Sequence, residues 1–172
     1  AGYLVAKYDV NPYQIYNTNT TQNLYAVSAN FSNKFAVVGH EVHLDIVTNG
    51  NNLTINTYSA NGQIMKAIAW NNPGYTAAGT SYYYLTTITS PSLTEINSYD
   101  FGLLDANGLS SLTNGDYVAT NHGIFKAIQS QQRLEYQPSS NGQFFSDIFF
   151  QLNNTQNGYA CGPNSLLMAT TD

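Results

Sequence analysis

The segment Gly39–Asp45 holds the densest group of side chains that could bind a metal ion or exchange protons. It reads Gly-His-Glu-Val-His-Leu-Asp. On a β-strand, Glu41, His43 and Asp45 would share one face, while His40 would point to the other. The two histidines then cannot serve one compact site without a bulge, and the spacing differs from the helical His-Glu-x-x-His motif. We therefore predict no metal site and no cofactor.

A thiol nucleophile is the second chemistry to consider, with Cys161 and His122 as its members. No family signature surrounds Cys161, so we predict a small buried apolar residue there. As the only cysteine it cannot form an intramolecular disulfide. Acid hydrolysis would need two paired carboxylates, and the spacing of Glu41, Glu95 and Glu135 brings no two together. We expect a protein that is not an enzyme.

Trp70 and the run Tyr82-Tyr83-Tyr84 could form an aromatic platform for a sugar. Aromatic residues in strands more often pack in the core or pair across strands, and we favour that interpretation. A carbohydrate-binding function stays open as an alternative. An isopeptide bond between asparagine and Lys34, Lys66 or Lys126 also stays open.

Charge is scarce in this chain of 172 residues, which has five Lys and Arg, ten Asp and Glu, and a net charge of −5. Ordinary soluble domains carry about a quarter charged residues. The basic residues are too dispersed for a phosphate-binding stripe, so we expect no nucleic-acid partner. No apolar run approaches the ~20 residues of a membrane span, and we expect a mature, extracellular chain from which a signal peptide has been removed. Few carboxylates also favour stability in acid.

The rest of the sequence predicts strands and turns. Six Asn-Gly pairs favour tight hairpins, and about ten runs rich in β-branched and aromatic residues alternate between them. The fold class predicted is all-β, a single Ig-like or pilin-like antiparallel β-sandwich over residues 24–172, with no internal repeat. The run Phe144–Leu152 is predicted to be a central strand covered on both faces. Ser90–Ser98, which contains Pro91, could hold a short helix or a crossover.

Residues 1–23 are predicted to be a separate N-terminal arm. The segment Gly2–Val10 alternates as an extended strand, with Leu4, Ala6, Tyr8 and Val10 on one apolar face. A polar stretch follows and is predicted to act as a tether up to Asn23. The strand could pair with its own sheet. It could also be donated to a neighbouring subunit, and repeated head to tail this contact would yield a filament.

Four Asn-x-Ser/Thr sequons are candidate N-glycosylation sites. Asn19 lies on the predicted tether and Asn52 beside a predicted turn, where a glycan could be accommodated. Asn30 falls inside a predicted strand, and Asn153 is the fourth candidate. We expect covalent N-glycans on this chain.

The arm Gly2–Val10, the tether Asn11–Asn23 and the Asn-, Thr- and Tyr-rich strands from Leu24 onward resemble the subunits of archaeal thread filaments. These are extracellular, glycosylated pilins joined by donor-strand complementation. The layout is similar, more distantly, to bacterial chaperone-usher pilins, which usually carry a disulfide. The resemblance implies a homopolymer of identical subunits at the cell surface, with a structural role in adhesion or biofilm. Two alternatives remain: a monomeric carbohydrate-binding or adhesin domain, and a viral jelly-roll capsid protein.

Overall fold

A computed structural model describes the chain over residues 3–6, 14–29, 33–49, 52–71, 74–89, 92–112, 114–128, 131, 133–140, 142–151 and 154–170. Within these ranges it holds strands, turns and one short 3₁₀ helix, η2, at Pro138–Ser140. No helix in the described ranges has the length and apolarity to cross a membrane. The predicted all-β class is confirmed.

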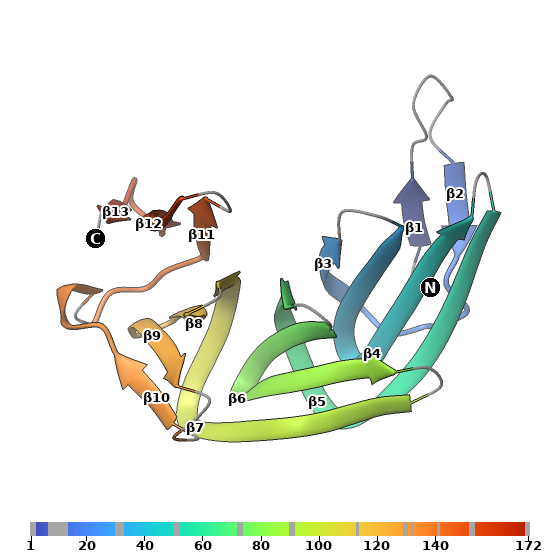
Figure 1. The fold of residues 1–172 in the computed structure, drawn as a ribbon, viewed down its shortest axis with the longest axis horizontal. Helices are drawn as coiled ribbons and strands as arrows, with labels where there is room; N and C mark the ends of the chain where they lie inside the picture. Colours follow the sequence, from blue (N-terminus) through green and yellow to red (C-terminus); the bar gives the residue numbers. More distant parts are fainter. Residues whose placement is uncertain are drawn as a thin grey trace.

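The thirteen strands of the described ranges are numbered in chain order in Figure 1. They are β1 (Tyr3–Ala6), β2 (Gln14–Asn17), β3 (Leu24–Ala29), β4 (Lys34–Asn49), β5 (Asn52–Asn71), β6 (Gly74–Thr89), β7 (Ser92–Leu112), β8 (Gly115–Thr120), β9 (Gly123–Ile128), β10 (Arg133–Tyr136), β11 (Asp147–Gln151), β12 (Asn154–Cys161) and β13 (Leu167–Thr170).

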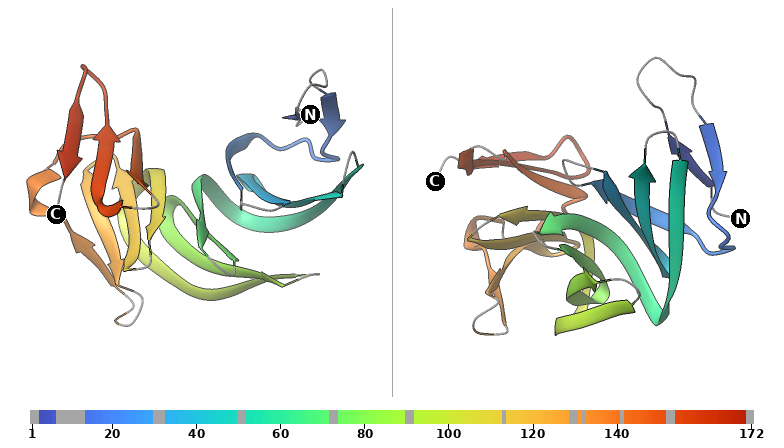
Figure 2. Two further views of the ribbon diagram at one scale, coloured as in Figure 1. Left: turned by 45° about the horizontal axis from the view of Figure 1, so that its top comes forward. Right: turned by 45° about the vertical axis from the view of Figure 1, so that its right-hand side comes forward.

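Strands β3 to β10 form one antiparallel meander in which each strand pairs with its neighbours in sequence. Two smaller sheets accompany it, a pair of β1 with β2 and a three-stranded sheet in the order β11-β12-β13. The meander sweeps through an arch, with β1 and β2 near one end and β11–β13 at the other (Figures 1 and 2).

The long strands of the meander divide into halves that pair with different neighbours. In β4, residues 35–39 pair with β3, whereas residues 42–49 pair with β5. The two ends of β4 meet, because the Thr48 amide donates to the Asn33 carbonyl oxygen at 2.8 Å. The strand folds back near Glu41, which has a φ of 56°. The two halves of β4 therefore form a tight hairpin. This hairpin is equivalent to the one that β8 and β9 form further along the chain.

The meander consequently consists of three consecutive antiparallel units. Unit 1 spans residues 24–59, unit 2 residues 64–99 and unit 3 residues 105–136. In each unit, the first paired residue of the first strand is followed directly by a shift in the pairing register. These residues are Leu24, Met65 and Ala106. The first pair of β11 is at Asp147, so each of the four positions lies 41 residues after the one before. A period of roughly 40 residues is typical of repeat architectures such as propellers, so the prediction of no internal repeat is wrong.

The units pack face to face in series. Ala36 and Val38 of unit 1 pack on Met65 and Tyr75 of unit 2. A cluster of small residues, including Ala78 and Ala106, joins unit 2 to unit 3. The β11–β13 sheet then covers unit 3 through a third cluster. The core is thus divided among successive interfaces, whereas the Ig-like sandwich of the sequence analysis would have one core between two sheets. The three clusters are Ala36, Val38, Met65, Ile68, Tyr75 and Ala77; Ala67, Ala69, Ala78, Ala106, Leu109, Val118 and Ala127; and Ala119, Ile124, Phe145, Ile148, Phe150 and Ala160. A fourth buried cluster lies on the other face of unit 1 and consists of Val37, Val42, Leu44 and Ile46.

Several local predictions need correction. Asn49-Gly50 and Asn114-Gly115 do adjoin hairpin turns, but Asn61-Gly62, Asn107-Gly108 and Asn157-Gly158 lie within strands. The stretch predicted as a helix or crossover belongs largely to strand β7. The run Phe144–Leu152 is not a central strand, because β11 pairs with β12 alone among the described residues and its Phe149 side chain is exposed.

Candidate assembly and binding surfaces

The N-terminal arm forms its own small sheet. β1 pairs antiparallel with β2, with Leu4 opposite Tyr16 and Ala6 opposite Gln14. Leu4 and Ala6 are thus in an extended strand, as predicted. Tyr8 and Val10, the other two predicted donor residues, lie outside the described residues. β1 and β2 form a sheet of their own, separate from the meander. Among the described residues, β1 therefore pairs with β2 alone.

The predicted tether is anchored to unit 1 where it is described. Thr18 is fully buried, and its carbonyl oxygen accepts a hydrogen bond from the Thr57 hydroxyl at 3.2 Å. The His40 amide donates to the Asn23 carbonyl oxygen at 2.9 Å. A ring nitrogen of His40 also lies 3.3 Å from the Gln22 side-chain oxygen. The segment therefore fixes where the arm leaves unit 1.

Two of the four predicted glycosylation sites are described, and both are exposed. Asn19 has a φ of 56°, a conformation that asparagine tolerates in turns, and its amide donates to the Asn17 side chain. Asn52 begins β5 and pairs with Asn49 across the hairpin. Asn30 and Asn153 lie outside the described residues.

The Gly39–Asp45 segment does contain a bulge, since the register shifts between His40 and Val42. The bulge does not gather ligands, because no group of three or more His, Cys, Asp or Glu side chains that could hold a metal occurs in the described part of the chain. Glu41 turns outward and accepts a hydrogen bond from the Gly62 amide at 3.2 Å.

His43 is the most unusual member of that segment. It is buried, its Nε2 atom has no hydrogen-bond partner among the described residues, and its ring packs edge-on against Tyr58. Burial lowers the pKa of His43 to about 4, because the charged imidazolium would lose its hydration. The nearby Asp45 is also buried, and desolvation raises its pKa while the charge of Lys34 partly counteracts this.

The other candidate reactive groups, where they are described, lie on separate strands and turns. Cys161 is exposed, which corrects the prediction that it is buried. His122 is exposed at the β8–β9 turn, where a ring nitrogen lies 3.2 Å from the Asn121 carbonyl oxygen. Glu135 is exposed on β10, and the side chain of Glu95 lies outside the described residues. Lys66 pairs with Asp105 at 3.3 Å, and Lys126 lies over the Tyr117 ring.

Trp70 serves packing in this structure. Its ring meets that of Tyr75 edge-on, with centroids 4.8 Å apart, and it packs against the cluster between units 1 and 2. Tyr82, Tyr83 and Tyr84 lie in β6, opposite residues 98–100 of β7. The backbone positions are those of a strand, and the orientation of these three side chains is not described.

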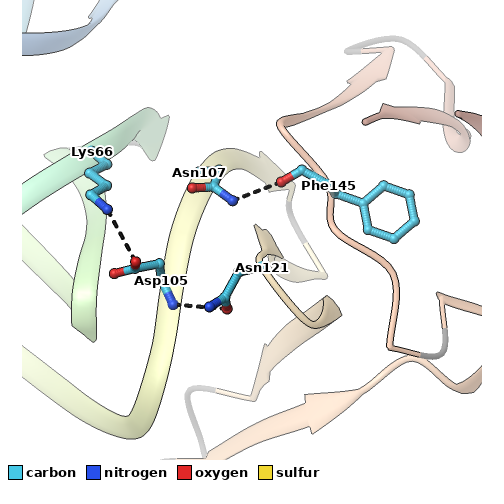
Figure 3. A network of polar contacts seen from close by, with 5 residues as sticks. All are labelled: Lys66, Asp105, Asn107, Asn121 and Phe145. Carbon is cyan, nitrogen blue, oxygen red and sulfur yellow. Dashed lines mark hydrogen bonds and ion pairs between the residues drawn. The ribbon is translucent and has the colours of Figure 1, made fainter. Parts of the chain in front are cut away.

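A polar network ties unit 3 to the segment before β11 (Figure 3). The Asn107 side chain donates to the Phe145 carbonyl oxygen at 2.9 Å, and the Phe145 amide donates to the Thr120 carbonyl oxygen at the same distance. The Asn121 side chain also accepts a hydrogen bond from the Asp105 amide at 3.1 Å. Sequence reasoning missed this network, since it read Asn107-Gly108 as a hairpin turn.

One cavity of about 280 Å³ opens between unit 3 and the β11–β13 sheet. Its lining is uncharged, with aromatic, hydroxyl and amide groups around an apolar floor. The Tyr117 and Phe150 rings, with centroids 4.7 Å apart, form part of it. Such a lining suits a neutral polar ligand more than an ion. The main polar and aromatic lining residues are Tyr117, Gln137, Ser139, Tyr159 and Thr170.

Comparison with known proteins identifies the architecture. No protein-family profile matches the sequence, and no curated protein matches it. Among solved structures, the chain is similar to a β-propeller domain, that of Cps50 (Swd1) from Myceliophteria thermophila, with a TM-score of 0.76 and 10% identity. That match covers 99% of this chain and 63% of the propeller chain. The computationally designed Ika4 protein is also similar, with a TM-score of 0.68, 9% identity, and coverage of 89% of this chain and 93% of the designed one. At such low identity the likeness concerns the fold alone.

Proposed function

We propose that this protein is a structural subunit of an extracellular, cell-surface filament, joined head to tail by its N-terminal strand. The observation that carries the proposal is the separate pairing of β1 with β2, outside the meander. A strand held by one neighbour can exchange into another subunit at the cost of few native hydrogen bonds, and the new backbone pairing replaces them. The role is assembly without catalysis.

An acceptor for the donated strand is suggested by the β11–β13 sheet. Unit 3 has four paired strands, β7 to β10, whereas this sheet has three among the described residues. β13 is an edge strand of four residues, Leu167–Thr170, and β1 has the same length. Neither strand contains a charged residue that would oppose pairing. We therefore propose the edge of β13 as the acceptor. The protein would be pilin-like because its subunits exchange a strand in this way.

Removal of residues 1–10 tests the proposal. The full chain should form filaments visible by electron microscopy, and the truncated chain should not. A synthetic peptide of residues 2–10 should bind the truncated chain and leave it as single subunits with the edge occupied. A truncated chain that still polymerises normally would show that the strand is not the joint.

A second candidate is a monomeric carbohydrate-binding adhesin, favoured by the uncharged cavity between unit 3 and the β11–β13 sheet. Its Tyr117 ring could stack on a sugar, while the Gln137 and Ser139 side chains could hydrogen-bond to hydroxyl groups. Glycan-array binding by a protein that remains a monomer would favour this function. Substitution of Tyr117 by alanine should then abolish the signal.

A further inference from the structure

The cavity of about 280 Å³ lies between unit 3 and the β11–β13 sheet, and both supply its walls. Unit 3 contributes Tyr117 and Ile124, and the segment after β10 contributes Gln137 and Ser139. The rest of the lining comes from the sheet, all three strands of which take part. Ligand sites typically enclose about 300–1,000 Å³, so a small ligand bound here would contact unit 3 and the sheet at once.

The lining fits a neutral ring that carries hydroxyl groups. The Tyr117 and Phe150 rings, with centroids 4.7 Å apart, form an aromatic wall. Gln137, Ser139 and Thr170 bring amide and hydroxyl groups, which can donate and accept hydrogen bonds. None of the lining residues is charged, so an ionic ligand would lose its hydration there without gaining a partner of opposite charge. A neutral monosaccharide meets these conditions, since its ring has an apolar face and its edge carries hydroxyl groups.

β13 is the strand of the sheet that such a ligand would affect most. Among the described residues it pairs with β12 alone, along Leu167–Thr170. Met168 and Thr170 share one face of this strand and line the cavity, whereas Leu167 lies on the opposite face and is 70% exposed. A ligand that contacts Met168 and Thr170 would therefore hold β13 against unit 3.

The edge of β13 is also the acceptor that we propose for the donated strand. β1 and β13 lie at opposite ends of the arch (Figures 1 and 2), so the strand that pairs with β13 would come from another copy. Addition of that strand fixes β13 in an extended conformation, which costs conformational entropy. A ligand that has already ordered β13 lowers this cost, and two binding events that favour the same conformation strengthen each other.

We infer that a neutral monosaccharide binds in this cavity and promotes head-to-tail assembly by ordering β13. The inference rests on the proposed strand exchange and adds the class of ligand that regulates it. Sugar and neighbouring subunit occupy different sites, because one lies in the cavity and the other pairs with the edge of β13. By thermodynamic linkage, the sugar raises the affinity for the neighbour by the same factor by which the neighbour raises the affinity for the sugar.

Assembly of the full chain in the presence of the methyl glycosides of glucose, galactose and mannose tests this inference. At a saturating concentration, at least one of these probes should lower the critical concentration for filament formation by about fivefold or more, measured by sedimentation of the polymer. Glucuronic acid and glucosamine, which carry a charge, should have no such effect. Ligand-observed NMR should show that the active probe binds more tightly to filaments than to subunits below the critical concentration.

Paired substitutions separate binding in the cavity from a general effect of sugar on the solvent. The double variant Gln137→Ala with Ser139→Ala removes two polar side chains from the lining, so the probe should no longer lower its critical concentration. The double variant Gln143→Ala with Ser146→Ala makes the same two changes at exposed positions outside the lining. This matched control should respond to the probe as the unsubstituted chain does.

The outcomes distinguish this inference from the proposed function. Filaments that depend on residues 1–10 but respond to none of the three glycosides would overturn the inference and leave the proposed function intact. An equal response of the two double variants would also overturn it, because the sugar would then act outside the cavity. A full chain that forms no filaments would overturn both.

Discussion

Asn107 holds Phe145 by a hydrogen bond from its side-chain nitrogen to the Phe145 carbonyl oxygen, at 2.9 Å. This bond fixes the entry of the chain into the β11–β13 sheet, because the Phe145 side chain is fully buried against unit 3. An Asn-Gly pair thus acts here as a clamp between two sheets of the arch.

Asn107→Ala should lower the free energy of unfolding by about 1 kcal/mol or more, since it leaves the partly buried Phe145 carbonyl oxygen without its donor. Hydrogen exchange should accelerate in β11 and β12 before it accelerates in unit 1. Gln143→Ala, at an exposed loop position nearby, is the control and should be neutral in urea denaturation. Equal stability of the two variants would contradict a clamping role.

His43 makes stability depend on pH. Its pKa is lowered from 6.5 to about 4 in the folded chain, so the unfolded chain takes up a proton first as the pH falls. The contribution of His43 to the free energy of unfolding is complete above pH 6.5. It decreases by about 3 kcal/mol in all as the pH falls toward 4. This opposes the acid tolerance expected from the scarcity of carboxylates.

His43→Leu should remove that decline, and denaturation curves between pH 7 and pH 4 measure it. The control is His122→Leu at an exposed position. Asp45 acts in the opposite direction, because its raised pKa makes the folded chain bind a proton earlier than the unfolded chain. Asp45→Asn measured beside His43→Leu separates the two contributions. An unchanged pH profile in His43→Leu would rule out the histidine as the cause.

Gly79 should not tolerate a side chain. A β-carbon at this position would lie against the Ile64 carbonyl oxygen and 2.8 Å from the Met65 Cα, both backbone atoms. Gly79→Ala should therefore destabilise the chain by about 3 kcal/mol or more through overpacking. Gly142→Ala is the control: its φ is 65° and nothing lies within 4 Å, so it should cost only the ~1 kcal/mol of a left-handed backbone. Thermal melting compares the two.

Glycosylation should reach the exposed sequons. Expressed in a host that attaches N-glycans, the chain should carry them at Asn19 and Asn52, since a glycosylated side chain must point into solvent. Asn19→Gln and Asn52→Gln should each reduce the intact mass by one glycan, whereas Asn114→Gln, outside any sequon, should leave it unchanged. Unmodified peptides at both sites would remove this support for an extracellular address.

The strands were predictable where apolar and β-branched residues alternate, as along β4 and in β8. Strand β7 was not, because Pro91 and a series of Asn, Ser, Asp and Gly residues interrupt its pattern. Its pairing comes from the neighbouring β6 rather than from its own composition. The exposed edge position of Phe149 also escaped prediction, since an apolar run reads as buried when no partner surface is known.

The repeat was missed because it is one of geometry. The residues that begin the four equivalent first strands are the apolar Leu24, Met65 and Ala106 and the charged Asp147, which is too little for a sequence motif. Gly39 and Gly79 occupy equivalent places in units 1 and 2, because a β-carbon on each would collide with the backbone at the start of the first strand of its own unit, at Asn23 and at Ile64. Of the candidate site residues, the arm strand was predicted, but the buried state of His43 and the exposed outer side of the β11–β13 sheet depend on how the units pack.

The meander of β3 to β10 has a consequence for how this chain acquires its structure during synthesis. Every hydrogen-bonded neighbour in it is also a neighbour in sequence, so each hairpin closes a short loop and pays little entropy before its contacts form. Unit 1 can complete its pairing while unit 3 is still untranslated, and each finished unit offers its face to the next. The arch would thus fold by adding one unit after another to the end of the folded part. A filament would lengthen in the same way, by adding one subunit after another.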